Sequence, residues 1–310
     1  MHIRTNPVLN KIFQPLILFC KWLGRNNPTL LVKIRYYFRF KKRLNLDEPQ
    51  TLNEKILYQS LKTEIGLRTK LTDKWRVREY IEECGLSDIL VKLYGVWDNA
   101  SKINFEDLPE KFVLKPNHGS GDIIIVNDKS NINIASIVTQ INDDLGKKYG
   151  ELEGGCHYYD IEPVVVAEEL LINDDISAKY SSSIIDYKIW CFNGKAHFIW
   201  TCSNRNDVTT EVMTYDREWK RHPEYSIFNK YYSEGVPLPK PASLERMLEI
   251  AEKLAKPFPV VRVDLYNLNG NIYFGEMTFT SLGGLIDFYT DKFQSLAGEL
   301  IDLNYIPSES

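Results

Sequence analysis

The chain has 310 residues, which suggests about two domain-sized units or one larger enzyme built from subdomains. Hydrophobic residues make up 44% and charged residues 26%, values that exclude a disordered chain and a collagen-like fibre. The net charge of −4 gives no reason to expect nucleic-acid binding, and five cysteines without a CxxC pair predict a reducing, cytoplasmic compartment instead of a disulfide framework or a zinc site.

Positive charge is concentrated at the start of the chain. Residues 1–46 hold ten Lys/Arg and no acidic residue, whereas the remaining chain holds 28 Lys/Arg against 42 Asp/Glu. Apolar and basic residues alternate over 8–43, which predicts a basic amphipathic helical segment. This segment either packs on the body with a solvated basic side or makes peripheral contact with the inner face of an anionic membrane. The apolar run 12–23 is too short and too often interrupted to span a bilayer.

The next part of the chain carries helix signals. Thr51 and Glu54 form a capping-box pattern that opens a helix running to about Lys62. Asp73 is placed to cap a second helix, and Gly85 lies where that helix should stop.

Strand signals dominate beyond residue 110. Two strands, 111–116 and 123–126, flank a polar glycine loop, and Asn-Gly pairs at 193–194 and 269–270 predict two hairpins. The other predicted elements are a helix capped by Asn133, a buried strand over 164–167, a strand over 208–215, a helix capped by Ser243 and a last helix over about 287–303. This order predicts an α+β fold, and neither a GxGxxG nor a GxxxxGK[ST] loop is present.

Three clusters of residues could carry chemistry. In the first, Lys115 ends an apolar strand and is followed by the glycine loop Asn117–Asp122. Glycines let backbone N–H groups close on phosphate oxygens, and a lysine supplies the charge. A plain hairpin with an edge lysine is the alternative.

The second cluster lies on the last predicted hairpin. The period of two along a strand puts Arg262 and Asp264 on one face, and Glu276 and Thr278 on one face of the partner strand. Two carboxylates this close repel unless a proton or a cation lies between them. The sequence therefore predicts either a magnesium platform or a network of ion pairs on the sheet face.

The third cluster is the buried strand that ends in Glu168 and Glu169. A buried strand that emerges into a polar turn can offer backbone groups to the edge of an adenine. A core strand that ends in two solvated acids is the alternative.

In this order, the motifs resemble the ATP-grasp superfamily, and within it the TupA-like branch linked to cell-surface polysaccharide synthesis. The similarity runs from about residue 45 to the end. The matching segments are Leu52–Lys55, Leu71–Lys74, Arg78–Tyr80, Phe112–Gly121, Asp186–Lys188, Cys191–Gly194, Arg262–Tyr266 and Tyr273–Thr280.

The resemblance implies an ATP-grasp fold in which two α+β lobes clamp ATP, preceded by a helical N-terminal segment. The subdomains expected are a basic helical segment (1–46), a helical subdomain (47–110), a small lobe with the phosphate loop (111–175) and a large lobe with the metal-binding carboxylates (176–310).

The resemblance also implies an ATP site. Lys74 and Lys115 would reach the ATP phosphates. The loop that closes over the phosphates would contain His118, Gly119, Ser120 and Gly121, and the hinge that meets adenine would be Glu168, Glu169, Leu170 and Leu171.

The same resemblance implies a Mg²⁺ site on the second cluster. Asp264 and Glu276 would hold the ion, with Arg262 beside the transferring phosphate and Lys188 as a further cation on the phosphate side. Thr278 stands where many relatives carry Asn, and its hydroxyl would be the third ligand.

The function that the resemblance implies is an ATP- and Mg²⁺-dependent carboxylate–amine ligase acting through an acyl phosphate. The TupA-like branch implies a uronic-acid or other carboxylate-bearing glycan precursor as one substrate and an amino acid or amino sugar as the amine. A kinase or other phosphotransferase, a glycosyltransferase of polysaccharide synthesis and a non-catalytic ATP-binding module remain alternatives.

Overall fold

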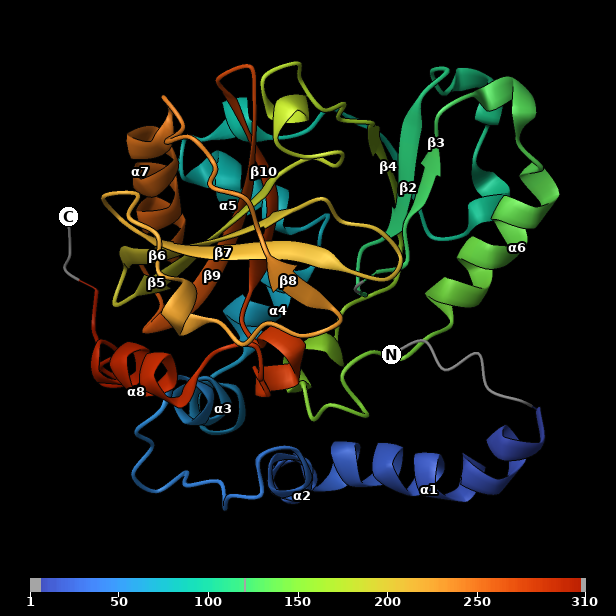
Figure 1. Cartoon of the computed structure of the whole chain (residues 1–310). Helices are drawn as coiled ribbons and strands as arrows, with labels where there is room; N and C mark the ends of the chain where they lie inside the picture. The colour runs from blue at the N-terminus through green and yellow to red at the C-terminus, as the bar shows by residue number, and fades with distance from the viewer. Residues whose placement is uncertain (1–6, 120, 308–310) are drawn as a thin grey trace.

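The computed structural model describes residues 7–119 and 121–307, and side chains from Phe13 onward. Within these residues the strands form a four-stranded sheet of order β1-β4-β2-β3 and a six-stranded sheet of order β10-β9-β5-β6-β7-β8, which lie side by side (Figure 1). The strands are β1 Leu93–Trp97, β2 Phe112–Pro116, β3 Ile124–Val126, β4 Val165–Glu169, β5 Asp186–Phe192, β6 Lys195–Ser203, β7 Thr210–Asp216, β8 Tyr232–Glu234, β9 Val260–Leu268 and β10 Asn271–Thr278.

The helices pack on both sheets, so the fold is α+β, as predicted. They are α1 Pro7–Asn26, α2 Pro28–Phe40, α3 Leu52–Lys62, α4 Gly66–Thr72, α5 Val77–Glu83, α6 Ile134–Leu145, α7 Leu244–Ala255 and α8 Asp291–Glu299. In Figure 1, α6 covers the small sheet, while α1 and α2 run along the lower edge of the molecule.

Both predicted hairpins are confirmed in the large sheet. The β5–β6 turn at Asn193–Gly194 and the β9–β10 turn at Asn269–Gly270 have positive φ at both residues. A two-residue turn of this kind matches the right-handed twist of the strands it joins. Asn tolerates this backbone better than most residues and Gly adopts it freely, so the sequence determines both turns locally.

Alternation along the strands gives the large sheet two different faces. Ile189 and Val263 belong to the apolar core that includes α7, whereas Trp190 and Trp200 face the opposite way, toward α3 and α8. On that second face Trp200 stacks on Phe288, with ring centroids 4.1 Å apart. Residues an even number of positions from Trp190 along β5, and the residues paired with them on β9, therefore share the second face. These include Arg262 and Asp264 of the second cluster.

The small sheet contains a strand that the sequence analysis did not predict. β1 lies antiparallel to β4, although it falls within the range expected to be a helical subdomain, 47–110. All five of its residues are half-buried, so it shows no alternating pattern, and Gly95 at its centre weakens the strand signal of Tyr94, Val96 and Trp97. The subdomain boundaries themselves stay a prediction.

The helix boundaries differ from prediction at both ends of the chain. The N-terminal segment forms two helices, because Asn27 caps α2 and Pro28 occupies its first turn. The last helix begins at Asp291, where Thr290 caps it, and not at Asp287. Ser243 precedes α7 but makes no capping hydrogen bond through its side chain. Among the described residues, no helix combines the length and the apolar character that crossing a membrane requires.

Candidate active site

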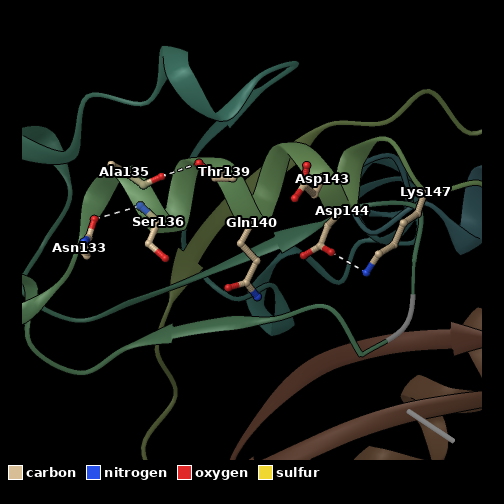
Figure 2. A pocket seen from close by; sticks show the side chains of 8 residues that line it. All are labelled: Asn133, Ala135, Ser136, Thr139, Gln140, Asp143, Asp144 and Lys147. Atoms are coloured by element: carbon tan, nitrogen blue, oxygen red, sulfur yellow. Dashed lines mark hydrogen bonds and ion pairs between the residues drawn. The ribbon is translucent and has the colours of Figure 1, made fainter. Parts of the chain in front are cut away.

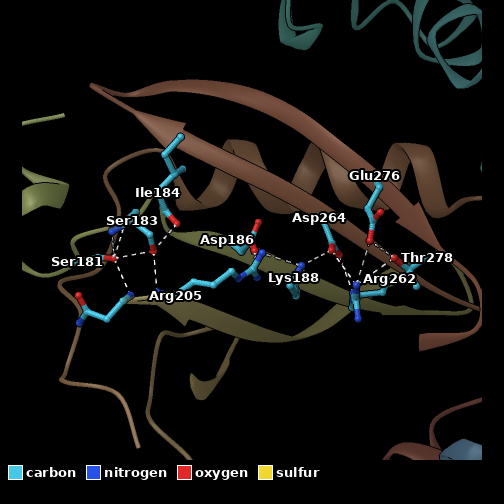
Figure 3. Close-up of polar contacts among 11 residues, drawn as sticks. Ser181, Ser183, Ile184, Asp186, Lys188, Arg205, Arg262, Asp264, Glu276 and Thr278 are labelled. Carbon is cyan, nitrogen blue, oxygen red and sulfur yellow. Dashed lines mark hydrogen bonds and ion pairs between the residues drawn. The ribbon is translucent and has the colours of Figure 1, made fainter. Parts of the chain in front are cut away.

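A row of charged side chains crosses the second face of the large sheet (Figure 3). Arg262 donates two hydrogen bonds to Asp264, from Nε to Oδ1 at 2.7 Å and from Nη2 to Oδ2 at 2.8 Å. Lys188 on the neighbouring strand β5 donates to the same Oδ2 at 2.5 Å and lies 3.4 Å from Asp186. All four side chains are buried, so the row is an ion-pair network built into the sheet.

Glu276 joins this row because of a bulge in β10. The register places Phe274 opposite Leu265 and Glu276 opposite Asp264, which leaves Gly275 as an extra residue. If Gly275 were paired regularly with Asp264 and not bulged, Glu276 would lie opposite Val263 and follow it toward the apolar core. A side chain at Gly275 would lie 3.0 Å from the Asp264 carbonyl oxygen, so glycine suits the bulge.

Thr278 and Glu276 complete the arrangement predicted for the second cluster. Thr278 Oγ1 donates to Glu276 Oε1 at 2.8 Å and accepts from Arg262 Nη2 at 3.0 Å. The Glu276 side chain is 40% exposed, in contrast to the buried Asp264. Glu276 therefore turns its carboxylate toward the space above the sheet.

The buried charges of the row stabilise one another. Burial alone would raise the pKa of Asp264, but Arg262 and Lys188 hold it below its ordinary value. Burial likewise opposes the charge on Lys188, but Asp186 and Asp264 raise its pKa. The row therefore stays charged at neutral pH, which suits it to stabilising charge that develops on a bound phosphoryl group.

The oxygen donors of this row fit a Mg²⁺ ion. Mg²⁺ is held by one or two carboxylates together with substrate phosphates and water. Asp264 and Glu276 face each other across paired strands, with the Thr278 hydroxyl beside them. The described residues contain no group of three His, Cys, Asp or Glu side chains that could hold a metal. The ion would therefore depend on phosphate oxygens to fill its coordination sphere.

Lys74 approaches the glycine loop from outside the small sheet. Its backbone N–H donates to the Asn117 carbonyl at 3.1 Å, and its ammonium group donates to the Gly119 carbonyl. Burial lowers the pKa of Lys74; Glu276 opposes this shift and Lys115 adds to it. The charge of Lys74 thus responds both to the small-sheet lysine and to the large-sheet carboxylate.

The glycine loop is held at its start through its first two residues. The Asn117 side chain accepts from Val164 N–H at 2.8 Å, and His118 Nε2 lies 3.0 Å from the Lys147 carbonyl. A β-carbon at Gly119 would force the Tyr149 ring to shift, whereas Gly121 has a positive φ and open space around it. Ser120 lies outside the described residues.

Lys115 and the predicted hinge meet at Glu168. The Glu168 carboxylate pairs with Lys115 at 2.5 Å and with Arg78 at 3.4 Å. Its backbone lies in β4, which is paired on both sides, while Glu169 ends the strand. Leu170 and Leu171 follow the strand and are half-buried. The adenine contact of this hinge stays a prediction.

Several residues at the site were not found by sequence reasoning. Lys147 lies 2.9 Å from Asp122 and 2.6 Å from Asp144, and so ties the glycine loop to α6. Ser281 Oγ accepts from Arg262 at 2.8 Å, and Arg205 pairs with Asp186 at the far end of the row. Two glycines, Gly283 and Gly284, follow Ser281 after one intervening residue, and this pair is the one local signal that could have marked the loop.

An open hollow of about 660 Å³ runs along α6, away from the charged row (Figure 2). It is lined by Ser136, Gln140, Asp144 and Lys147, among others. These residues form the outer side of a helix whose inner side packs on the small sheet through Ile137 and Ile141. The hollow is therefore helix surface, and the charged row remains the candidate site.

Replacing Lys115 with methionine should raise the Kd for ATP roughly tenfold to a hundredfold, because a hydrogen bond to a charged phosphate contributes about 1.5–3 kcal/mol. Isothermal titration of ATP into the protein measures this. Lys111→Met changes an exposed lysine four residues earlier and should leave the Kd unaltered. Equal affinities in the Lys115 variant and the unaltered protein would contradict a phosphate contact at Lys115.

Comparison with known protein families agrees with the fold described above. An α+β fold of a four-stranded and a six-stranded sheet with packed helices is the fold of an ATP-grasp protein. The chain belongs to the TupA-like ATP-grasp family, whose profile, TupA-like ATPgrasp, matches residues 54–302. A search of curated proteins finds no match.

Solved structures that resemble this chain are longer proteins. An L-amino acid ligase from Bacillus licheniformis is 14% identical, covers 93% of this chain and 64% of its own, and gives a TM-score of 0.48. A D-alanine–D-alanine ligase from Bacillus anthracis is 16% identical, covers 75% of this chain and 64% of its own, and gives 0.46. The chain thus spans less than two thirds of the length of either.

Proposed function

We propose that the protein is an ATP- and Mg²⁺-dependent carboxylate–amine ligase that works through an acyl phosphate. The observation that carries the proposal is the row Lys188–Asp264–Arg262–Glu276 on the large sheet, together with Lys74, whose pKa is affected both by Glu276 of this row and by Lys115 of the small sheet. Family membership supports the same activity. The substrates we propose are a uronic acid or another carboxylate of a cell-surface glycan precursor, and an amino acid or amino sugar.

In the proposed reaction, a substrate carboxylate oxygen attacks the γ-phosphorus of ATP, and the bond from that phosphorus to the bridging oxygen breaks to release ADP. The amine nitrogen then attacks the acyl carbon, and phosphate leaves as the amide forms and the nitrogen loses a proton. This chemistry needs charge neutralisation and positioning more than a protein nucleophile.

Each part of the row has a separate role in this proposal. Asp264, Glu276 and Thr278 would hold Mg²⁺, which neutralises phosphate charge when it is bound. Arg262 is fixed by Asp264 and Ser281 and would face the phosphoryl group in transfer. Lys74 and Lys115 would hold the phosphates from the opposite side.

Turnover of Mg-ATP to ADP tests the proposal, measured with uronic acids, amino acids and amino sugars as candidate substrates and hydroxylamine as a trap. We expect ADP release that depends on a carboxylate, together with a hydroxamate of that acid. Phosphorylation of a stable acceptor without any amine would instead indicate a kinase. ADP release that no carboxylate stimulates would contradict the ligase.

Glu276→Gln should weaken Mg²⁺ binding at least about tenfold and reduce turnover with it, because the amide keeps the shape of the side chain but not its charge. Mg²⁺ titration of ATP turnover measures the change. Glu245→Gln, on the exposed surface of α7, is the matched control and should behave like the unaltered protein.

A further inference from the structure

Large apolar side chains are exposed on both N-terminal helices. We name this set the N-terminal face, and its members are between 39% and 67% exposed: Phe13, Leu16, Leu18, Phe19 and Trp22 of α1, and Leu30, Ile34, Tyr37 and Phe38 of α2. Single exposed apolar residues are ordinary, but nine on two consecutive helices form a surface that usually has a partner.

The packing of α2 on the body is complete without this surface. Val32 and Tyr36 are buried in a small core together with Leu57 of α3. Leu30, Ile34 and Tyr37 recur at helical spacing and point away from that core, since they are exposed. The helix α2 therefore carries apolar side chains on its outer side as well as on its inner side.

The cations of this segment fall into two groups. Arg39 pairs with Asp287 and Lys42 with Asp291, and these ion pairs hold α2 against the body. Lys33 and Arg43 have no ion-pair partner among the described residues. They line an open hollow of about 390 Å³ whose other walls are Ile34, Tyr37, Phe38 and Leu44. Apolar walls and unpaired cations thus meet in one outward-facing hollow.

We propose that the N-terminal face binds the surface of an anionic phospholipid bilayer. Apolar side chains would enter the boundary between headgroups and acyl chains, while Lys33, Arg43 and Lys41 would meet the lipid phosphates. The Lys41 ammonium group lies over the Phe38 ring, 5.5 Å from its centroid, so its charge lies next to the N-terminal face. The helices lie on the bilayer in this arrangement and do not cross it.

Charge favours a bilayer over a second copy of this chain. Residues 1–46 contain no acidic side chain, so two such faces packed together would oppose cations with cations. An anionic bilayer offers both an apolar interior and phosphates of opposite charge, which are the two features that the N-terminal face presents.

Co-sedimentation of the full chain with vesicles tests this. We expect binding to vesicles of phosphatidylcholine mixed with phosphatidylglycerol, and about tenfold or more weaker binding to phosphatidylcholine alone or at high salt. Trp22→Ser with Phe38→Ser, and separately Lys33→Glu with Arg43→Glu, should each reduce binding by about tenfold or more. Val236→Ser with Ile306→Ser removes exposed apolar side chains elsewhere and should change nothing.

Two results would overturn the proposal. One is equal binding to anionic and neutral vesicles, or none to either. The other is a dimer in light scattering that Phe38→Ser converts to a monomer, without vesicle binding by the unaltered protein. Circular dichroism shows whether each variant folds, and ATP turnover in free solution should be the same in all of them, so the result does not depend on the proposed ligase activity.

Discussion

Replacing Arg262 with lysine should slow ATP turnover by about a hundredfold to a thousandfold while the chain still folds. The guanidinium group makes two bonds to Asp264 and reaches Ser281 and Thr278 as well. Lysine keeps the charge but has no planar fork, so it cannot hold this geometry. Loss of one fixed donor at a developing oxyanion typically costs about 2.7–4 kcal/mol of transition-state stabilisation. Steady-state kcat is the measurement.

Arg262→Met tests how much Arg262 contributes to the stability of the fold. It leaves Asp264 and Glu276 with less positive charge nearby, and breaking a buried ion pair costs about 3–5 kcal/mol in the free energy of unfolding. Guanidinium unfolding measures this, and Arg246→Lys on exposed α7 is the control for both experiments. If Arg262→Lys keeps full turnover, the planar guanidinium group of Arg262 has no part in the chemistry.

Acid should destabilise the protein through His157, by about 2 kcal/mol between pH 7 and pH 5. Burial, and then the nearby Arg68 cation, lower the pKa of this side chain to about 3 from 6.5. Below pH 6.5 the unfolded chain gains a proton that the folded chain does not accept, so the free energy of unfolding falls as the pH falls. This loss continues until the pH approaches 3.

His157→Asn tests this, because asparagine does not titrate. Unfolding free energies at pH 7 and pH 5 should differ by about 2 kcal/mol less in the variant than in the unaltered protein. Other histidines, such as His118 and His197, remain in both proteins and cancel in the comparison. If the free energy of unfolding changes equally with pH in the two proteins, His157 does not titrate in this way.

Local sequence signals predicted the parts of the fold that are determined locally. The Asn-Gly turns at 193–194 and 269–270 and the capping box of Thr51 and Glu54 all recur in the structure. The period of two along β9 placed Arg262 and Asp264 on one face, and their side chains do meet there. In each case, neighbouring residues alone decide the conformation.

What the sequence did not predict depends on contacts between distant segments. Lys147 lies 25 residues from its partner Asp122, and Arg78 lies 90 residues from Glu168. β1 is a strand because β4 lies beside it, and its own residues give no such pattern. The ion pairs of Glu168 likewise arise only once β2 and β4 are paired.

The Gly275 bulge also limits how this hairpin can change in length. With the bulge in place, an odd number of residues, 271–275, separates the Asn269–Gly270 turn from the Glu276 carboxylate. Deleting Gly275 would leave the carboxylate opposite Asp264, because regular pairing would then continue directly from Phe274 and Leu265. Adding one residue between the turn and the bulge would instead reverse the phase of the strand and turn the carboxylate into the apolar core. The extra residue of the bulge thus lets β10 lose one residue, but not gain one, while Glu276 stays beside Asp264.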